Sequence, residues 1–266
     1  MRVFSVTSGK GGVGKTSLVC NIARRLGQLG QKVLLIDADM GLANVDIVMG
    51  LAPQANLADL FLQDADLSSL LVSGPENVTV LPASSGVREL SQLSDEQVMK
   101  FLTAVDELDI EFDVVLIDTG AGIGSNVLYF NAAAQDVLVV ATPEPTSVTD
   151  AYAVIKVLSN VHKVRNFRLV VNQVENRKQA LKIYRYLTNV ADEYLDVNIE
   201  YLGHVVSGPE VSQAVMQRRL FLDHAPESPV SDCVRAVVDD LLRQPPAQQA
   251  TGNLQFFWRK LIQPGV

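Results

Sequence analysis

The chain has 266 residues, of which 48% are hydrophobic, enough to form a large core in one or two domains. Its formal net charge of −8 disfavours non-specific binding to nucleic acid, although a local basic patch could still bind it. The two cysteines, Cys20 and Cys233, lie far apart and outside any C-x-x-C pair, so we do not expect one chain to build a zinc or iron–sulfur site.

Strand and helix patterns alternate along the chain. Apolar, β-favouring runs predict strands over residues 3–6, 33–36, 77–81, 114–117, 137–141, 167–171 and 199–206. Helical apolar spacing predicts helices over residues 18–29, 94–108, 146–158, 177–194 and 230–242. Ser94 and Gln97 form a capping-box pattern at the start of one of them. The alternation indicates an α/β fold, with a mostly parallel central sheet covered by helices on both faces and ligands bound beyond the carboxyl ends of its strands.

A glycine-rich segment connects the first strand to the first helix. Residues 8–17 read SGKGGVGKTS and match the pattern G-x-x-x-x-G-K-[ST]. Such a loop turns backbone N–H groups toward phosphate oxygens, and the helix that follows points its positive end at the same place. Lys15 is placed to reach the β- and γ-phosphates, and the Thr16 hydroxyl to bind Mg²⁺. The predicted ATP-binding residues here are Gly9, Gly11, Gly12, Val13, Gly14, Lys15, Thr16 and Ser17.

Two further strands are followed by aspartate. Asp37 and Asp39 come after the strand over 33–36, and Asp118 begins the segment DTGAGIG after the strand over 114–117. We interpret Asp118 as a carboxylate that holds Mg²⁺ through water, and its glycines as a loop that moves when the γ-phosphate leaves. The aspartate pair is expected to manage the metal and the attacking water. A solvated turn and a tight strand-to-helix turn are the simpler alternatives.

Later segments carry weaker signals. The Asn172 amide could contact adenine, but an asparagine at a strand end is also a common helix cap. Pro209, in the segment SGPE after the last strand, is expected to help close the adenine pocket. The segment EPTS at 144–147 opens a helix and either touches a second subunit or only caps that helix. The three histidines have no spacing suited to a metal, and we treat them as structural or surface residues.

The end of the chain differs from the rest. Residues 1–244 form the predicted nucleotide-binding domain, 245–252 a linker and 253–266 an amphipathic helix. The apolar stripe of that helix consists of Leu254, Phe257, Trp258, Leu261 and Ile262. Two cations beside the stripe suit it to an anionic membrane surface; packing on its own domain or on a partner protein is the alternative. No signal peptide is expected and no apolar run is long enough to span a membrane, which favours a cytoplasmic location.

Lys10, directly after the first glycine of the loop, is a residue that an ordinary phosphate loop does not need. The resulting pattern K-G-G-x-G-K-[ST] resembles the deviant Walker A motif of the MinD/ParA class of P-loop ATPases. Further matching segments are DADMGLANVDIVMGL (37–51), DTGAGIGSNV (118–127), EPTSVTDAYAVIK (144–156) and the tail GNLQFFWRKLI. With them, the whole chain resembles the FlhG/FleN branch of MinD-like ATPases, which regulate flagellar number and placement.

The resemblance implies a slow, Mg²⁺-dependent ATPase that dimerises when ATP is bound and associates reversibly with the cytoplasmic face of the inner membrane. In this class Lys10 reaches the nucleotide of the other subunit, Asp39 positions the attacking water and Asp37 supports the metal shell. The implied catalytic residues are Lys10, Lys15 and Asp39, and the implied metal residues are Thr16, Asp37 and Asp118.

The branch also implies protein partners. These are flagellar C-ring proteins and a flagellar transcription activator. The FlhF GTPase is a further implied partner, although members of the branch stimulate it with an N-terminal extension and here the first strand begins at residue 2.

Two other functions share this fold. A ParA-like DNA-partitioning ATPase would need a basic surface, and we do not expect direct DNA binding from this acidic chain. A metal-cluster carrier would need paired cysteines at a dimer face, which the two distant cysteines do not provide.

Overall fold

The computed structural model describes residues 1–83 and 93–243. Its strands are β1 (Arg2–Ser8), β2 (Val33–Ala38), β3 (Val72–Ser73), β4 (Val78–Leu81), β5 (Val114–Ala121), β6 (Asp136–Ala141), β7 (Asn166–Val174) and β8 (Asn198–Val206). Its helices are α1 (Lys15–Gln28), α2 (Val45–Met49), α3 (Leu57–Leu62), the 3₁₀ turn η1 (Leu67–Leu70), α4 (Asp95–Asp106), α5 (Ser125–Ala133), α6 (Pro145–His162), α7 (Arg177–Tyr194), α8 (Pro209–Met216), α9 (Phe221–His224) and α10 (Pro229–Arg243).

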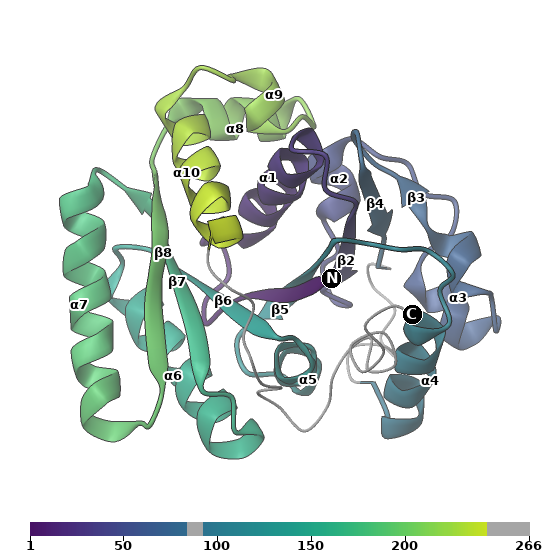
Figure 1. The fold of residues 1–266 in the computed structure, drawn as a ribbon, viewed down its shortest axis with the longest axis horizontal. Coiled ribbons are helices and arrows are strands. Elements are labelled where there is room, and N and C mark those ends of the chain that lie inside the picture. Colours follow the sequence, from purple (N-terminus) through teal and green to yellow (C-terminus); the bar gives the residue numbers. More distant parts are fainter. Residues whose placement is uncertain (84–92, 244–266) are drawn as a thin grey trace.

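Within the described residues the strands form one eight-stranded sheet in the order β3-β4-β2-β5-β1-β6-β7-β8. All neighbouring strands are parallel except β3 and β4, which pair antiparallel at one edge. Helices cover both faces: Figure 1 shows α1 and α10 on one side of the sheet and α5 and α6 on the other. The predicted α/β architecture is therefore confirmed.

The β2 sequence is apolar without interruption, and the burial of its side chains explains this. Leu35 packs into the core beneath α1 and α10, whereas Leu34 and Ile36 pack into the core on the opposite face of the sheet. All three side chains are fully buried. A strand covered on both faces cannot alternate between apolar and polar residues, so it reads as a continuous apolar run.

The predicted capping box at α4 is confirmed. The Ser94 hydroxyl accepts a hydrogen bond from the Gln97 N–H at 3.3 Å, and the Gln97 side-chain oxygen accepts one from the Ser94 N–H at 2.9 Å. The two bonds satisfy N–H groups that a helix start otherwise leaves without partners.

The predicted domain boundary falls at the end of α10, the last described element. The linker 245–252 and the amphipathic helix 253–266 lie outside the described residues and stay predictions. In the part of the chain that is described, no helix combines the length and the apolar character needed to cross a bilayer.

Candidate functional site

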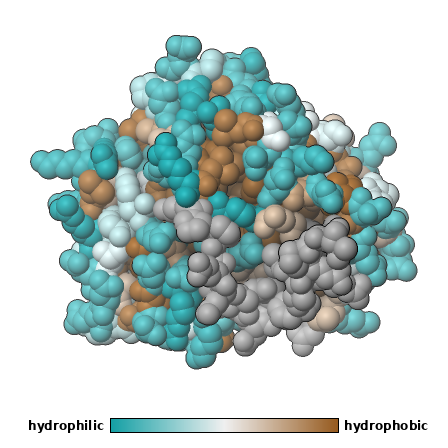
Figure 2. All heavy atoms as spheres, viewed as in Figure 1, coloured by the Kyte–Doolittle hydropathy of each residue, from teal (hydrophilic) through white to brown (hydrophobic). Residues whose placement is uncertain are grey.

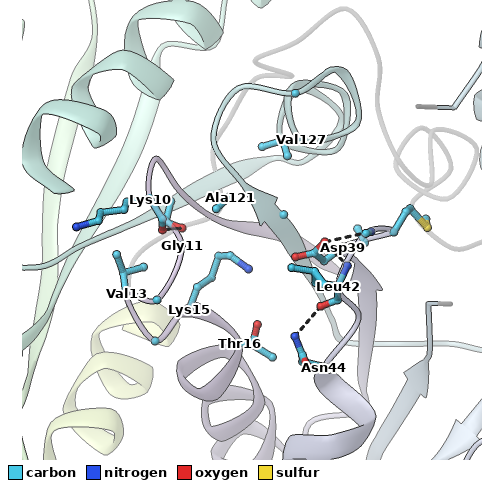
Figure 3. A pocket seen from close by; sticks show the side chains of 18 of the residues that line it. Lys10, Gly11, Val13, Lys15, Thr16, Asp39, Leu42, Asn44, Ala121 and Val127 are labelled. Atoms are coloured by element: carbon cyan, nitrogen blue, oxygen red, sulfur yellow. Dashed lines mark hydrogen bonds between the residues drawn. The ribbon is translucent and has the colours of Figure 1, made fainter. Parts of the chain in front are cut away.

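The loops that follow β1, β2 and β5 enclose a cavity of about 550 Å³ at the carboxyl ends of these strands (Figure 3). It is lined by Ser8, Lys10, Gly11, Gly12, Val13, Gly14, Lys15, Thr16, Ser17, Ala38, Asp39, Met40, Gly41, Leu42, Asn44, Gly120, Ala121, Gly124, Asn126 and Val127. β1, β2 and β5 are neighbours in the sheet, so their end loops meet at one place. The sheet thus brings together three segments that are far apart in the sequence.

The loop after β1 depends on glycine for different reasons at different positions. Gly12 and Gly14 have φ angles of 79° and 81°, in the left-handed region that other residues rarely adopt. A Cβ at Gly9 would stand 2.2 Å from the backbone of Asp150, so this glycine permits close packing against α6. At Gly11 a Cβ would meet nothing within 4 Å, because the backbone there borders open space.

Lys15, the first residue of α1, lies at the floor of the cavity. Its Nζ donates to Asp118 Oδ1 at 2.5 Å, and the two side chains are only 7% and 1% exposed. Asp37 stands opposite Asp118 in the β2–β5 register and is also 1% exposed. Two buried aspartates and one buried lysine therefore lie together beneath the cavity, and the lysine pairs with Asp118.

Burial is the main cause of an unusual titration at Asp37. Burial first, and the neighbouring Asp118 second, together raise the pKa of this carboxyl to about 7. Backbone N–H groups of Val45, Asp39 and Asn44 donate to the carboxyl and oppose the shift. Asp37 thus ties together the loop that follows β2. Neither Asp37 nor Asp118 lines the cavity; both lie just below it.

Asp39, by contrast, lines the cavity itself. Its Oδ1 accepts hydrogen bonds from the N–H groups of Gly41 and Leu42 at 3.2 and 3.0 Å. A Cβ on Gly120 would stand 3.5 Å from the same oxygen, so the loop after β2 approaches the end of β5 closely at this carboxylate. Its second oxygen accepts no hydrogen bond among those seen in the described residues.

Two hydroxyl residues at the start of α1 complete the wall. Thr16 lines the cavity, and the buried Ser17 Oγ has no hydrogen-bond partner within the described residues. Among these residues, no three or more His, Cys, Asp and Glu side chains are arranged to hold a metal ion. The Thr16 hydroxyl on the cavity wall fits a Mg²⁺ ion that takes its other ligands from phosphate and water oxygens, which is how Mg²⁺ commonly binds beside nucleotides.

Lys10 behaves differently from Lys15. Figure 3 shows its side chain directed away from Lys15, at the rim of the cavity. Its Nζ pairs with the Glu144 carboxylate and donates to the Thr146 hydroxyl at 3.2 Å. The start of α6, one of the weaker sequence signals, thus contacts Lys10 of the same chain.

A second cavity, of about 460 Å³, adjoins the first and shares Gly14 and Ser17 with it. Asn172 at the end of β7 and Gly208 before α8 line it, together with apolar side chains such as Val211 and Phe221. Pro209 is the first residue of α8 and lies between two lining residues without lining the cavity itself.

Sequence reasoning missed several lining residues. Asn126 and Val127 belong to α5, a helix that was not predicted, and Met40, Leu42 and Asn44 lie in the loop after β2. The signal available for them was their position, between three and nine residues after Asp37 or Asp118.

A glycine loop between β1 and α1, a buried lysine at the start of that helix, and aspartates in the carboxyl-terminal halves of two neighbouring strands define a P-loop nucleotide-binding protein. Comparison with known proteins places the chain within this class. Residues 1–171 match the family model described as an AAA domain.

Two bacterial proteins match nearly the whole chain. The antiactivator FleN of Pseudomonas aeruginosa is 39% identical over 263 residues, which cover 99% of this chain and 94% of FleN. The flagellum site-determining protein YlxH of Helicobacter pylori is 31% identical over 234 residues, which cover 88% of this chain and 79% of YlxH. The chain belongs to the MinD/ParA-type ATPases, in the FleN/FlhG branch.

Solved structures agree with this assignment. A chain of the MinC:MinD cell division protein complex of Aquifex aeolicus is similar with a TM-score of 0.75 at 27% identity, over 94% of this chain and 98% of that chain. MinD of Pyrococcus horikoshii complexed with Mg-ADP has a TM-score of 0.73 at 23% identity, over 91% and 96%, and shares the fold.

Proposed function

We propose that the protein is a slow Mg²⁺-dependent ATPase whose ATP-bound form pairs with a second copy, associates with the membrane and regulates the number or placement of flagella. The two relatives named for flagellar roles, FleN and YlxH, support the biological assignment. The MinD structure complexed with Mg-ADP supports the choice of cofactor.

The main support for the proposal is that Lys15, Asp39 and Thr16 all line one cavity of about 550 Å³. Triphosphate oxygens suit the loop because its open backbone borders the cavity at Gly11 and Gly12. The orphaned Ser17 hydroxyl offers a further polar contact. Phosphoryl transfer requires positioning and charge stabilisation more than covalent chemistry, and these residues supply both.

Each side chain has a role that its position supports. Bound Mg²⁺ would neutralise developing phosphate charge, with Thr16 as its protein ligand and Asp37 and Asp118 acting through water. Lys15 would neutralise the transferred phosphoryl group. Asp39, the carboxylate on the cavity wall, would orient the attacking water. The second cavity, with Asn172 and the segment around Pro209, would hold adenine.

The position of Lys10 supports the proposed dimer. Its ammonium lies at the exposed rim and is held by the exposed Glu144, so it can exchange this partner for a phosphate presented by another subunit at little cost. Flagellar C-ring proteins, the FlhF GTPase or a flagellar transcription activator remain the proposed partners, on the resemblance alone.

An Asp39→Ala variant tests the proposal. It should bind ATP and form a dimer in size-exclusion chromatography with Mg-ATP, but it should hydrolyse ATP at least 10²-fold more slowly, because the water loses its acceptor. Lys15→Ala should bind no ATP and stay monomeric, and Lys10→Ala should bind ATP but dimerise weakly. An Asp39→Ala protein that hydrolyses ATP normally, or a wild-type chain that stays monomeric with a non-hydrolysable analogue, would contradict the proposal.

One observation supports the rival DNA-partitioning function. Arg177, Lys178, Lys182 and Arg185 are exposed on α7, and no acidic residue occurs between 177 and 191. Figure 2 shows mostly hydrophilic side chains on the edge of the molecule where Figure 1 places α7. Binding of duplex DNA in a mobility-shift assay at moderate salt, lost on Lys182→Glu, would favour this rival; no shift would favour the flagellar function.

A further inference from the structure

Two side-chain amides from the end of β7 hold the phosphate loop from behind. Asn172 Nδ2 donates to the Val13 carbonyl oxygen at 2.7 Å, and Gln173 Nε2 donates to the Gly12 carbonyl oxygen at 3.3 Å. The two donors are adjacent in sequence, and so are the two acceptors. We call this pair of contacts the amide clamp.

The backbone of Gln173 is shaped to form the clamp. Its φ of 58° lies in the left-handed region, an uncommon conformation for a residue other than glycine. Its N–H donates to Asn172 Oδ1 at 2.9 Å, which fixes the orientation of the Asn172 amide. A Cβ on Gly14 would stand 2.6 Å from Asn172 Nδ2, so the close approach of the clamp also requires glycine at position 14.

The clamp determines the direction of the loop N–H groups. In a trans peptide the C=O of one residue and the N–H of the next point in opposite directions. When the carbonyls of Gly12 and Val13 are held toward β7, the N–H groups of Val13 and Gly14 must therefore point the other way. Val13 and Gly14 both line the first cavity. The N–H groups that would receive phosphate oxygens are thus aimed by contacts on the far side of the loop.

We propose that Gln173, acting with Asn172, is a positioning residue that pre-orients the phosphate loop, so that its side chain governs affinity for the phosphate chain and not for the base. This inference rests on the proposed nucleotide-binding function. It also gives Asn172 a task in addition to any contact with adenine, because its amide nitrogen donates one hydrogen bond to the loop.

The test compares ATP with inorganic tripolyphosphate, which has the phosphates but no base. Calorimetric titration in the presence of Mg²⁺ should show that Gln173→Ala weakens both ligands by the same factor, about two- to tenfold, the equivalent of one neutral hydrogen bond. Gln173→Glu keeps the size of the side chain but cannot donate to the Gly12 carbonyl, and it should weaken both ligands at least as much.

Asn77 provides a matched control. It too has a left-handed backbone, with φ of 59°, and its Nδ2 donates to a glycine carbonyl, that of Gly27, at 3.0 Å. It precedes β4 and so lies at the opposite end of the strands from the cavity. Asn77→Ala should lower the melting temperature without changing either affinity.

A further variant separates backbone strain from the side chain. Gln173→Gly removes the amide but accepts the left-handed backbone without cost, so it should be more stable than Gln173→Ala and weaken both ligands equally. Wild-type affinity in either variant would overturn the clamp, and so would a loss confined to ATP, which would make Gln173 a base contact. Failure of the wild-type chain to bind either ligand would instead overturn the proposed function.

Discussion

The floor of the candidate site places two buried carboxylates beside a single buried ammonium. Lys15 pairs with Asp118, and Asp37 lies opposite Asp118 across two neighbouring strands. Such a buried cluster costs folding free energy, because desolvation of each charge is only partly offset by its partners. The raised pKa of Asp37 reflects this cost, because burial disfavours the charged form of its carboxyl.

Stability should therefore depend on pH in a defined window. An aspartate in the unfolded chain titrates near 3.9, whereas Asp37 in the folded protein holds its proton up to about pH 7. Between these values the native state binds more protons, so this residue's contribution to stability is complete below about pH 4 and is lost as the pH rises through about 7. Urea unfolding of the nucleotide- and magnesium-free protein from pH 5 to pH 8 measures it.

Asp37→Asn supplies the comparison, because the amide keeps the shape of the side chain and cannot ionise. The variant should lose the part of the pH dependence that Asp37 causes. Asp39→Asn, two residues away on the cavity wall, should retain it. Parallel pH profiles for wild type and Asp37→Asn would show that the titration belongs to another group.

At the scale of elements, the loop between β1 and α1 is held on two sides. Gly9 packs against the backbone of α6, and the loop's later carbonyls accept from β7. Gly11 lies between these contacts and borders open space. The glycines of this motif therefore have different structural roles, close packing at Gly9 and open backbone at Gly11, and the motif pattern alone does not distinguish them.

Because Gly9 is tightly packed and Gly11 is not, alanine substitutions at the two positions should differ in their effect on stability. Gly9→Ala forces a Cβ into the backbone of Asp150 and should lower the free energy of unfolding by about 1–3 kcal/mol. Gly11→Ala meets nothing and should change it by less than about 0.5 kcal/mol. Urea denaturation without nucleotide measures both, and equal destabilisation would refute the packing role assigned to Gly9.

At the scale of the molecule, α10 joins the core on the α1 side of the sheet. Val234, Val238 and Leu241 of α10 are fully buried in the core that also contains α1. The Arg2 guanidinium donates to the Leu241 carbonyl at 2.7 Å, which joins the first strand to the end of the last described helix.

Truncation after Gln244 should keep ATP binding and hydrolysis and abolish ATP-dependent co-sedimentation with anionic liposomes, because the apolar stripe of residues 254–262 is removed. In the full chain, Trp258→Glu should have the same effect. Gln255→Glu adds the same charge beside the stripe and should bind liposomes much more strongly than Trp258→Glu. Undiminished binding by the truncated protein would refute the membrane role of the tail.

The sequence was sufficient to predict the order of the long strands and of most long helices, and the aspartates that lie toward the carboxyl ends of β2 and β5. Apolar runs, helical periodicity and the glycine-lysine motif act over a few residues, and the carboxyl ends of parallel strands must meet at one edge of the sheet. Short helices were missed because segments such as α2 and α9, of five and four residues, have little stability of their own and depend on tertiary packing.

Only the tertiary structure decided which groups touch. Lys15 meets Asp118 across 103 positions, Lys10 meets Glu144 across 134, and Asn172 meets the Val13 carbonyl across 159. It also decided that Asp37 and Asp118 are buried while Asp39 faces the cavity, although all three come after apolar runs in the sequence. The physical reason is that partners, desolvation and pKa depend on what distant segments pack against a residue, which a local pattern does not encode.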